Sequence, residues 1–262
     1  MNENNYFIPD RFKGKVVIVT GAESGIGKAS ATRFAQEGAI VYGFGLRNEL
    51  GQEWVQSVKD AAGTATFFAC DVTKIAQVEE CIKNVISAHG RIDVLVNNAA
   101  RFLVGDVTDT SEEDWDSVLA VNLKSIFLTS KFTIPTMKKT GGAIINIASV
   151  HAFASYTKYS AYAASKGAVV ALSRQMAIDH TADGIRVNSV VVGGVKTDMS
   201  IGLALAGGAT VDNLGFIEDP KVLGRTAHPS EIAAGITYLA SPDASFVVGS
   251  PFWIDGGLTA DL

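Results

Sequence analysis

Apolar residues fall into short runs along the chain, and longer segments with helical spacing separate these runs. The runs lack period-two alternation and predict buried strands at about 15–20, 39–44, 64–69, 92–96, 143–147, 186–192 and 252–254. The segments between them predict helices at about 25–37, 49–62, 75–89, 112–139 (in two parts), 159–181 and 230–239. Strands that are apolar on both sides are typical of a parallel sheet with helices on both faces. The pattern therefore predicts an α/β fold, a doubly wound, Rossmann-like parallel sheet.

The alternation of strands and helices is not interrupted by a linker, a repeat or a low-complexity segment. We therefore expect a single domain over residues 15–262, which is a common length for one α/β sheet. Residues 1–14 do not continue the pattern, and we expect them to form a loose N-terminal arm.

Composition narrows the class of protein. The chain has 262 residues, 47% of them hydrophobic, and a formal net charge of −5, so nucleic acid is not an expected partner. No apolar run approaches about 18 residues, so we expect no membrane span. Cys70 and Cys81 are too few for a disulfide framework, and no basic, apolar leader opens the sequence. These features predict a cytoplasmic protein, and we predict no metal site.

Tyr162 and Lys166 stand four residues apart in an Ala-rich segment of helical pattern, so they share one helical face. An ammonium beside a phenol is expected to lower the tyrosine pKa from its ordinary value near ~10 and to ease proton transfer. The alternative is a polar pair on a solvated helix, and the spacing alone does not decide.

A glycine-rich loop follows the first predicted strand. Gly21, Gly25 and Gly27 have the spacing Gly-x-x-x-Gly-x-Gly between a strand and a helix. Glycines permit a tight turn there and let backbone N–H groups approach a pyrophosphate at the helix N-terminus. The loop predicts a dinucleotide site, although strand–helix turns also use glycine for other reasons.

Several motifs recur in a characteristic order: the glycine loop, Asp71-Val72, Asn97-Asn98-Ala99, Asn122, Ser149, and the pair Tyr162 and Lys166. Over essentially the whole chain this order resembles the short-chain dehydrogenase/reductase family. The resemblance implies hydride transfer between a nicotinamide cofactor and an alcohol carbon. It implies Tyr162 as general acid/base, Ser149 as the group that orients the substrate oxygen, Lys166 on the nicotinamide ribose, and Asn122 beside a proton-relay water.

The resemblance also marks the cofactor site. The predicted contacts are Gly21, Glu23, Ser24, Gly25, Ile26, Gly27, Arg47, Asp71, Val72, Asn98, Ala99, Ala100, Tyr162, Lys166, Gly193, Val195 and Thr197. Ala100 replaces the family's usual glycine. Asp71 either accepts from the adenine amino group or caps the next helix.

The cofactor is NAD or NADP. Gly45 stands where a carboxylate would hold the ribose of NAD, and Arg47 can pair with the 2′-phosphate of NADP. Glu23 would repel that phosphate or bind a ribose hydroxyl itself, which gives a slight preference for NAD. Plain surface charge remains an alternative for both side chains.

The substrate is expected to be a sugar or polyol whose reacting hydroxyl has hydroxyl neighbours. Ser149-Val150-His151 resembles the corresponding stretch of bacterial glucose 1-dehydrogenases of the family. We predict substrate contacts from Ser149, His151, Tyr162 and Arg101, although Arg101 also fits an exposed surface position. By resemblance, residues 198–224 are expected to form a lid over the substrate. The alternative for this segment is an ordinary insertion that packs on the sheet.

Two other functions are alternatives to the oxidation of a sugar or polyol. One is the reduction of 3-oxoacyl thioesters or other ketones, and the other is a non-catalytic, cofactor-binding regulator. Relatives imply a homo-oligomer, a tetramer or dimer.

Overall fold

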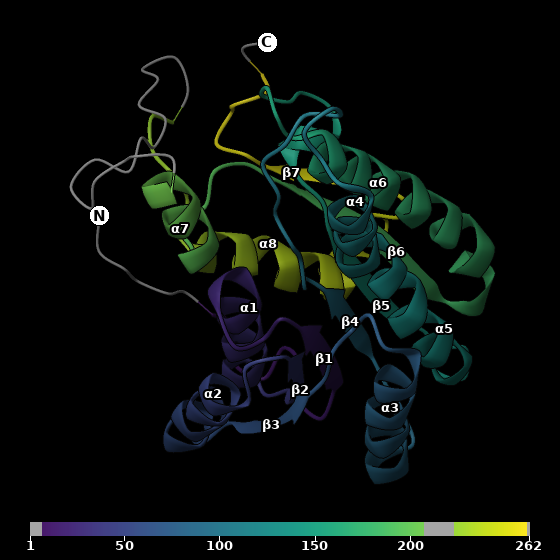
Figure 1. Ribbon diagram of the computed structural model, residues 1–262. Helices are drawn as coiled ribbons and strands as arrows, with labels where there is room; N and C mark the ends of the chain where they lie inside the picture. Colours follow the sequence, from purple (N-terminus) through teal and green to yellow (C-terminus); the bar gives the residue numbers. More distant parts are fainter. Residues whose placement is uncertain (1–6, 207–222, 261–262) are drawn as a thin grey trace.

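One parallel sheet forms the centre of the molecule in a computed structural model that describes residues 7–206 and 223–260 (Figure 1). Its strand order is β3-β2-β1-β4-β5-β6-β7, and every pair of neighbours is parallel. The strands are β1 (Val16–Thr20), β2 (Ile40–Gly45), β3 (Thr64–Ala69), β4 (Val94–Asn97), β5 (Gly142–Ile147), β6 (Ile185–Val192) and β7 (Pro251–Ile254). The predicted Rossmann-like sheet and single domain are confirmed.

Helices connect consecutive strands. They are α1 (Gly25–Gln36), α2 (Asn48–Asp60), α3 (Ile75–His89), α4 (Glu112–Leu119), α5 (Ser125–Met137), α6 (Ser160–His180), α7 (Asp198–Ala206) and α8 (Pro229–Ala240). A π-helical turn at Ala120–Lys124 joins α4 to α5, and a 3₁₀ turn at Val150–Ala152 follows β5. The sequence pattern predicted neither turn.

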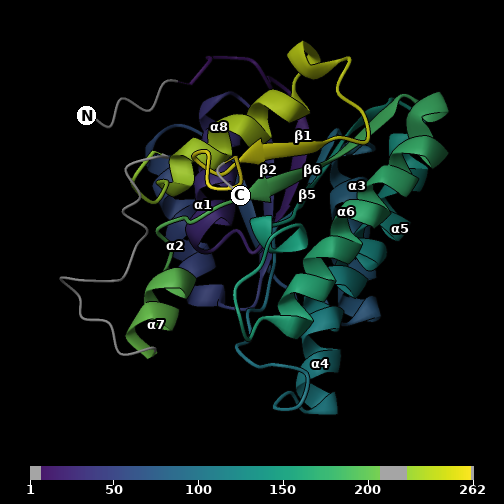
Figure 2. The same cartoon turned by 90° about the horizontal axis from the view of Figure 1, so that it is seen from above.

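Two helical layers cover the two faces of the sheet. Figure 2 shows α1, α2 and α8 on one side of the strands, and α3, α5 and α6 on the other. The strands alternate between these layers: Val17 and Val19 of β1 belong to the first core, whereas Val16 and Ile18 belong to the second. The inner strands β1, β2, β4, β5 and β6 are therefore buried on both faces, which explains why their sequences are continuously apolar.

The N-terminal arm is packed more firmly than the sequence suggested. Phe12 is buried, and its ring meets that of Phe34 in α1 edge-on at 4.8 Å. Nearby, the fully buried Glu37 accepts from Arg11 at 2.6 Å and from Arg33 at 3.0 Å. Residues 11 and 12 thus belong to the domain, because an aromatic ring and an ion pair fix them to α1.

The carboxyl ends of the parallel strands lie along one edge of the sheet. The glycine loop follows β1 there, and the segments that begin at Asn98, Ala148 and Gly193 follow β4, β5 and β6. Because β1 lies between β2 and β4, the chain reverses its direction of winding at β1, which is where open α/β sheets bind ligands. In the described part of the chain no helix combines the length and apolarity needed to cross a membrane.

At the far edge of the sheet, Phe252 of β7 packs against the core that contains α8. Trp253, its neighbour, is 40% exposed, and its ring lies 4.7 Å from the tilted ring of Phe153, which is exposed too. Leu258 packs against the core cluster beside β5 and α6. Of the aromatic residues near the C-terminus, Phe252 is thus used in the domain's own core, and Trp253 stays on its surface.

Candidate active site

The glycine loop after β1 is built so that only glycine fits. A Cβ atom on Gly27 would lie 2.0 Å from the carbonyl oxygen of Gly21, far inside contact distance. Gly21 and Gly25 have φ values of +65° and +53°, in the left-handed region that other residues rarely adopt. This leaves an open backbone cradle at the N-terminus of α1, the kind of site that holds a pyrophosphate.

The segment after β4 braces this loop. The hydroxyl of Thr20 accepts from the backbone N–H groups of Asn98 at 2.9 Å and Ala99 at 3.0 Å. The side-chain amide of Asn98 donates to the carbonyl of Thr20 at 3.0 Å. Asn98 is thus brought to the loop as predicted, with its side chain used to hold the loop in shape.

Three residues predicted to contact the cofactor, Glu23, Ser24 and Arg47, lie together at the end of β2. The carboxylate of Glu23 packs against Gly45 and is almost entirely buried, with a side-chain exposure of 8%. Arg47 donates to the hydroxyl of Ser24 at 2.6 Å, and its Nε lies 3.5 Å from Glu23 Oε1. A buried carboxylate oxygen and a glycine cradle are features that fit a dinucleotide, with its ribose hydroxyls and pyrophosphate.

Asp71 makes a local turn rather than a helix cap. Its Oδ1 accepts from the backbone N–H of Thr73 at 2.9 Å and from the Thr73 hydroxyl at 2.7 Å, while Lys74 occupies the N-cap position of α3. Val72 beside it is buried. Because Oδ1 is used in this turn, the predicted contact with the adenine amino group would use Oδ2 of Asp71, and it stays a prediction.

The segment after β6 meets the glycine loop from the other side. A Cβ on Gly193 would lie 2.8 Å from Cα of Asp255, so glycine is required at this close approach. Thr197 caps α7: its hydroxyl accepts from the Ser200 N–H at 3.2 Å. A methyl group on Gly25 would lie 3.2 Å from Cγ2 of Thr197, which places Thr197 beside the phosphate cradle. Val195, also predicted, is buried and forms a bridge with Ala227.

Tyr162, Ser149 and Lys166 come together where β5 ends and α6 begins. The Ser149 hydroxyl lies near the phenol of Tyr162, whose pKa it lowers, and it accepts from the backbone N–H of His151 at 3.3 Å. The Lys166 ammonium lies 5.6 Å from the centre of the Tyr162 ring and donates to the carbonyl of Ile147 at 2.7 Å. The structure thus assembles the phenol, hydroxyl and ammonium that the sequence pattern predicted.

The pKa values of this group differ from the sequence expectation. Burial raises the pKa of Tyr162 to about 12, and the neighbouring Ser149 hydroxyl lowers it more weakly. Burial lowers the pKa of Lys166 to about 8. The expectation that Lys166 lowers the tyrosine pKa is therefore wrong for the protein alone. Desolvation of the phenolate outweighs the neighbouring ammonium, which is directed at a carbonyl.

Asn122 lies in the π-helical turn between α4 and α5 and is fully buried. Its Oδ1 accepts from the N–H of Arg101 at 2.7 Å, and its amide donates to the Arg101 carbonyl and to the Ser165 hydroxyl, both at 2.9 Å. Both amide hydrogens are therefore committed. The side chain ties the segment after β4 to α6, and the predicted relay water remains a prediction.

Aromatic rings form the wall beside Tyr162. Phe102 lies 4.5 Å from the Tyr162 ring, and His151 lies 5.6 Å from it on another side. Tyr159 contacts both of them, at 5.0 Å from Phe102 and 4.8 Å from His151. Sequence reasoning found His151 but missed Phe102 and Tyr159. The signal that the sequence offers is that Phe102 directly follows Arg101 and that Tyr159 stands one helical turn before Tyr162.

His151 is a neutral member of this wall. Burial lowers its pKa from the ordinary value of 6.5. Its Nδ1 is paired with the hydroxyl of Ser155 at 2.9 Å, so Nε2 is the ring atom left to meet a substrate. A neutral ring favours contact with a substrate hydroxyl over contact with an anion, and the substrate contact of His151 stays a prediction.

Arg101 is directed elsewhere. Its guanidinium donates to Asp114 at 2.8 Å and to the hydroxyl of Ser117 at 2.7 Å, both in α4. The predicted substrate contact from Arg101 is not supported, because its charge is neutralised on that helix. Only its backbone, held by Asn122, serves the site.

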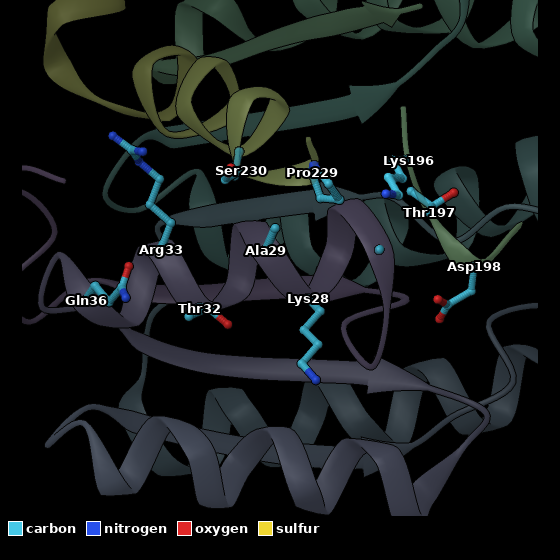
Figure 3. Close-up of a pocket in the computed structure, with 12 residues that line it drawn as sticks. Lys28, Ala29, Thr32, Arg33, Gln36, Lys196, Thr197, Asp198, Pro229 and Ser230 are labelled. Atoms are coloured by element: carbon cyan, nitrogen blue, oxygen red, sulfur yellow. The ribbon is translucent and has the colours of Figure 1, made fainter. Parts of the chain in front are cut away.

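The predicted lid at 198–224 is seen only in part. Residues 198–206 form α7, and residues 207–222 lie outside the described part of the chain. A cavity of about 360 Å³ lies between the start of α7, α1 and α8, with Thr197 and Asp198 beside the first turn of α1 (Figure 3). Tyr162 does not line it, so this cavity is separate from the reacting centre.

Comparisons with known proteins agree with this geometry. Residues 21–259 match the family model described as enoyl-(acyl carrier protein) reductase. The meso-2,3-butanediol dehydrogenase of Serratia marcescens is 40% identical over 252 residues, which is 95% of this chain and 96% of that protein. The structure of a short-chain type dehydrogenase/reductase from Mycobacterium marinum is similar at a TM-score of 0.88, with 33% identity, over 95% of this chain and 96% of that one.

A third comparison is the ligand-free aldohexose dehydrogenase of Thermoplasma acidophilum, with a TM-score of 0.87 and 33% identity over 97% of each chain. The chain belongs to the short-chain dehydrogenase/reductase family. It is an NAD(P)-dependent oxidoreductase that acts on CH–OH groups and the corresponding carbonyls.

Proposed function

We propose that this enzyme oxidises a secondary hydroxyl of a small polyol or sugar, with Tyr162 as the general acid/base. The observation that carries the proposal is the convergence of the Ser149 hydroxyl and the Tyr162 phenol, with Lys166 buried behind them. These groups can receive one substrate oxygen between them.

Oxidation of an alcohol removes a hydride from carbon and a proton from oxygen. When bound, the nicotinamide supplies the hydride acceptor. Tyr162 takes the proton in oxidation and returns it in reduction, while Ser149 donates a hydrogen bond to the substrate oxygen as charge develops. Lys166 lies 5.6 Å from the centre of the Tyr162 ring, where it can hold the nicotinamide ribose, the role that the family resemblance implies.

The wall of the site supports a compact substrate. Phe102 and Tyr159 offer apolar ring faces close to Tyr162, and His151 offers one neutral polar nitrogen. A molecule with a carbon skeleton against the rings and a second hydroxyl near His151 matches both features. A vicinal diol, as in the name of the Serratia relative, is the smallest such substrate.

A 3-oxoacyl thioester reductase is the second candidate, and the description of the matching family model favours it. Both reactions use the same proton donor, so only substrate tests separate them. A regulator without catalysis is disfavoured, because such a protein has no need for the buried Lys166 and the paired Tyr162.

Nicotinamide absorbance with a substrate panel tests the proposal. The panel contains 2,3-butanediol, glucose and cyclopentanol for oxidation and an acetoacetyl thioester for reduction, each with NAD and with NADP. We expect the largest kcat/KM with the diol or the sugar. Clear reduction of the thioester without turnover of any polyol would contradict the proposed substrate class.

The cofactor is proposed to be NAD, because Glu23 places a buried carboxylate beside the loop that would hold the adenosine end. A cytoplasmic location is part of the proposal, since Cys70 and Cys81 are buried free thiols that suit a reducing compartment.

We also infer that the enzyme is a homo-oligomer, a dimer or tetramer. An open apolar hollow lies over α5 and α6 and the π-helical turn before α5, with Leu123, Phe127 and Leu172 among its lining residues. Phe127 is 52% exposed there. Light scattering after gel filtration is expected to give a multiple of 27.5 kDa, and a monomer would contradict this inference.

A further inference from the structure

The end of β2 lacks a side chain, and a residue of the glycine loop fills the vacated space. A Cβ atom on Gly45 would lie 2.0 Å from Oε2 of Glu23 and 2.6 Å from its carboxyl carbon. Glu23 and any side chain at position 45 therefore compete for the same volume. The carboxylate of Glu23 stands almost where the first atoms of an aspartate at position 45 would stand.

One oxygen of this carboxylate is buried and lacks a hydrogen-bond donor among the described residues. The Glu23 side chain is 8% exposed, and its Oε2 is buried without a hydrogen-bond partner among the described residues. Its Oε1 lies 3.5 Å from Nε of Arg47, beyond the length of a good hydrogen bond. A buried carboxylate oxygen without a donor is costly, so a ligand that brings hydroxyl donors is favoured at this place.

We propose that Glu23 holds the adenosine ribose of the cofactor and makes the enzyme prefer NAD to NADP. In dinucleotide-binding sheets an acidic residue at the end of the second strand accepts from the ribose hydroxyls. Here the carboxylate comes from the phosphate loop, and Gly45 is the condition for its fit. This inference rests on the proposed function, because it assumes that a nicotinamide dinucleotide binds along the loop.

The positive charge of Arg47, which could attract the 2′-phosphate of NADP, lies closer to solvent than the carboxylate of Glu23. Arg47 donates to Ser24 at 2.6 Å, and its side chain is 49% exposed, so it lies on the solvent side of the carboxylate. A 2′-phosphate that reached Arg47 would bring a dianion toward the buried carboxylate of Glu23. Like charges at that separation repel, and burial weakens the screening by salt.

The test measures dissociation constants of NADH and NADPH by nicotinamide fluorescence, so it needs no substrate. The single variants E23Q and E23S remove the charge, and G45A displaces the carboxylate by steric overlap. We expect each to weaken NADH binding about 10- to 100-fold, the range for hydrogen bonds to a charged group, with NADPH binding unchanged or tighter. E49Q removes an exposed carboxylate from the neighbouring α2 and should leave both constants within about twofold.

A relocation variant tests the position itself. E23S/G45D removes the carboxylate from the loop and returns one to the end of β2. We expect it to recover most of the NADH affinity that E23S loses, and a double variant no better than E23S would contradict the shared position.

The outcomes separate this inference from the proposed function. If the wild type binds neither dinucleotide, the proposed function fails. If the wild type binds NADH and both E23Q and G45A keep its preference, only the role of Glu23 fails. A wild type that prefers NADPH, and loses that preference in R47L, would overturn the inference and assign the selection to Arg47.

Discussion

Lys166 Nζ donates to the backbone carbonyl of Ile147 at 2.7 Å, and this bond links α6 to the end of β5 two residues before Ser149. Lys166 is buried, so its ammonium needs that partner. The bond fixes α6, which carries Tyr162, against the end of β5, and Ser149 follows two residues later as the N-cap of the 3₁₀ turn. The relative position of phenol and hydroxyl is therefore set by the packing of α6 on β5 and by this capped turn.

The direction of the reaction should decide its pH dependence. Because the pKa of Tyr162 is raised to about 12, the phenol of the free enzyme is protonated at neutral pH and ready to act as an acid. Oxidation needs the phenolate, so its kcat/KM should rise with pH between 7 and 9.5, by up to about tenfold per unit. Reduction needs the phenol, so its kcat/KM should not rise. If kcat/KM rises with pH in the same way for oxidation and for reduction, the assignment of Tyr162 as the general acid/base is contradicted.

Lys166 should also give stability a pH dependence. Its folded pKa of about 8 lies below the ordinary value of 10.5. Between these values the unfolded chain binds a proton that the folded chain does not, so the free energy of unfolding rises with pH. Urea unfolding should show a gain of about 1–2 kcal/mol from pH 8 to pH 9.5 in the wild type. K166M is the matched variant and should lack this gain; an equal gain in K166M would refute the assignment.

Most of this framework could be read from the sequence. The inner strands are buried on both faces and therefore appear as uninterrupted apolar runs, and the glycine loop has a spacing that only a close backbone approach requires. Tyr162 and Lys166 share a helical face because of their spacing of four. Local patterns of this kind depend on neighbours in the chain, so the sequence displays them directly.

Asn122 is expected to act as a positioning residue. N122A removes three hydrogen bonds and leaves the Arg101 backbone groups and the Ser165 hydroxyl without this partner. We predict a loss of about 2–3 kcal/mol in the free energy of unfolding. We also predict a fall in kcat, because the Arg101 backbone that Asn122 holds leads directly into Phe102, whose ring contacts Tyr162. S165A removes one of the three bonds and should cost less. An N122A enzyme with wild-type stability and kcat would show that this anchor is dispensable.

Glu37 should anchor the N-terminal segment. Its carboxylate is fully buried between Arg11 and Arg33, so E37A leaves two guanidinium groups short of their partner. We expect a loss of about 3 kcal/mol in urea unfolding, as is typical when one member of a buried ion pair is removed. D10N breaks the exposed pair with Lys13 and is the control, with a change within about 0.5 kcal/mol. Similar losses in both variants would contradict the role of burial.

Other features of the site depend on contacts between distant segments, and the sequence does not display them. Phe102 and Tyr159 are 57 positions apart in the printed numbering, yet their rings meet at 5.0 Å. Arg101 has Asp114 and Ser117 within reach only because the loop after β4 folds onto α4. The raised pKa of Tyr162 follows from burial, which a helical spacing cannot specify.

The central claim is that Tyr162 exchanges the proton with the substrate oxygen. The most direct measurement compares wild type and Y162F in two ways: kcat/KM with the best substrate of the panel, and the dissociation constant of NADH by fluorescence. Removing the general acid/base while keeping the ring should lower kcat/KM by about 10³-fold and leave the NADH constant within about threefold. A Y162F enzyme that keeps more than about a tenth of the wild-type rate would contradict the account.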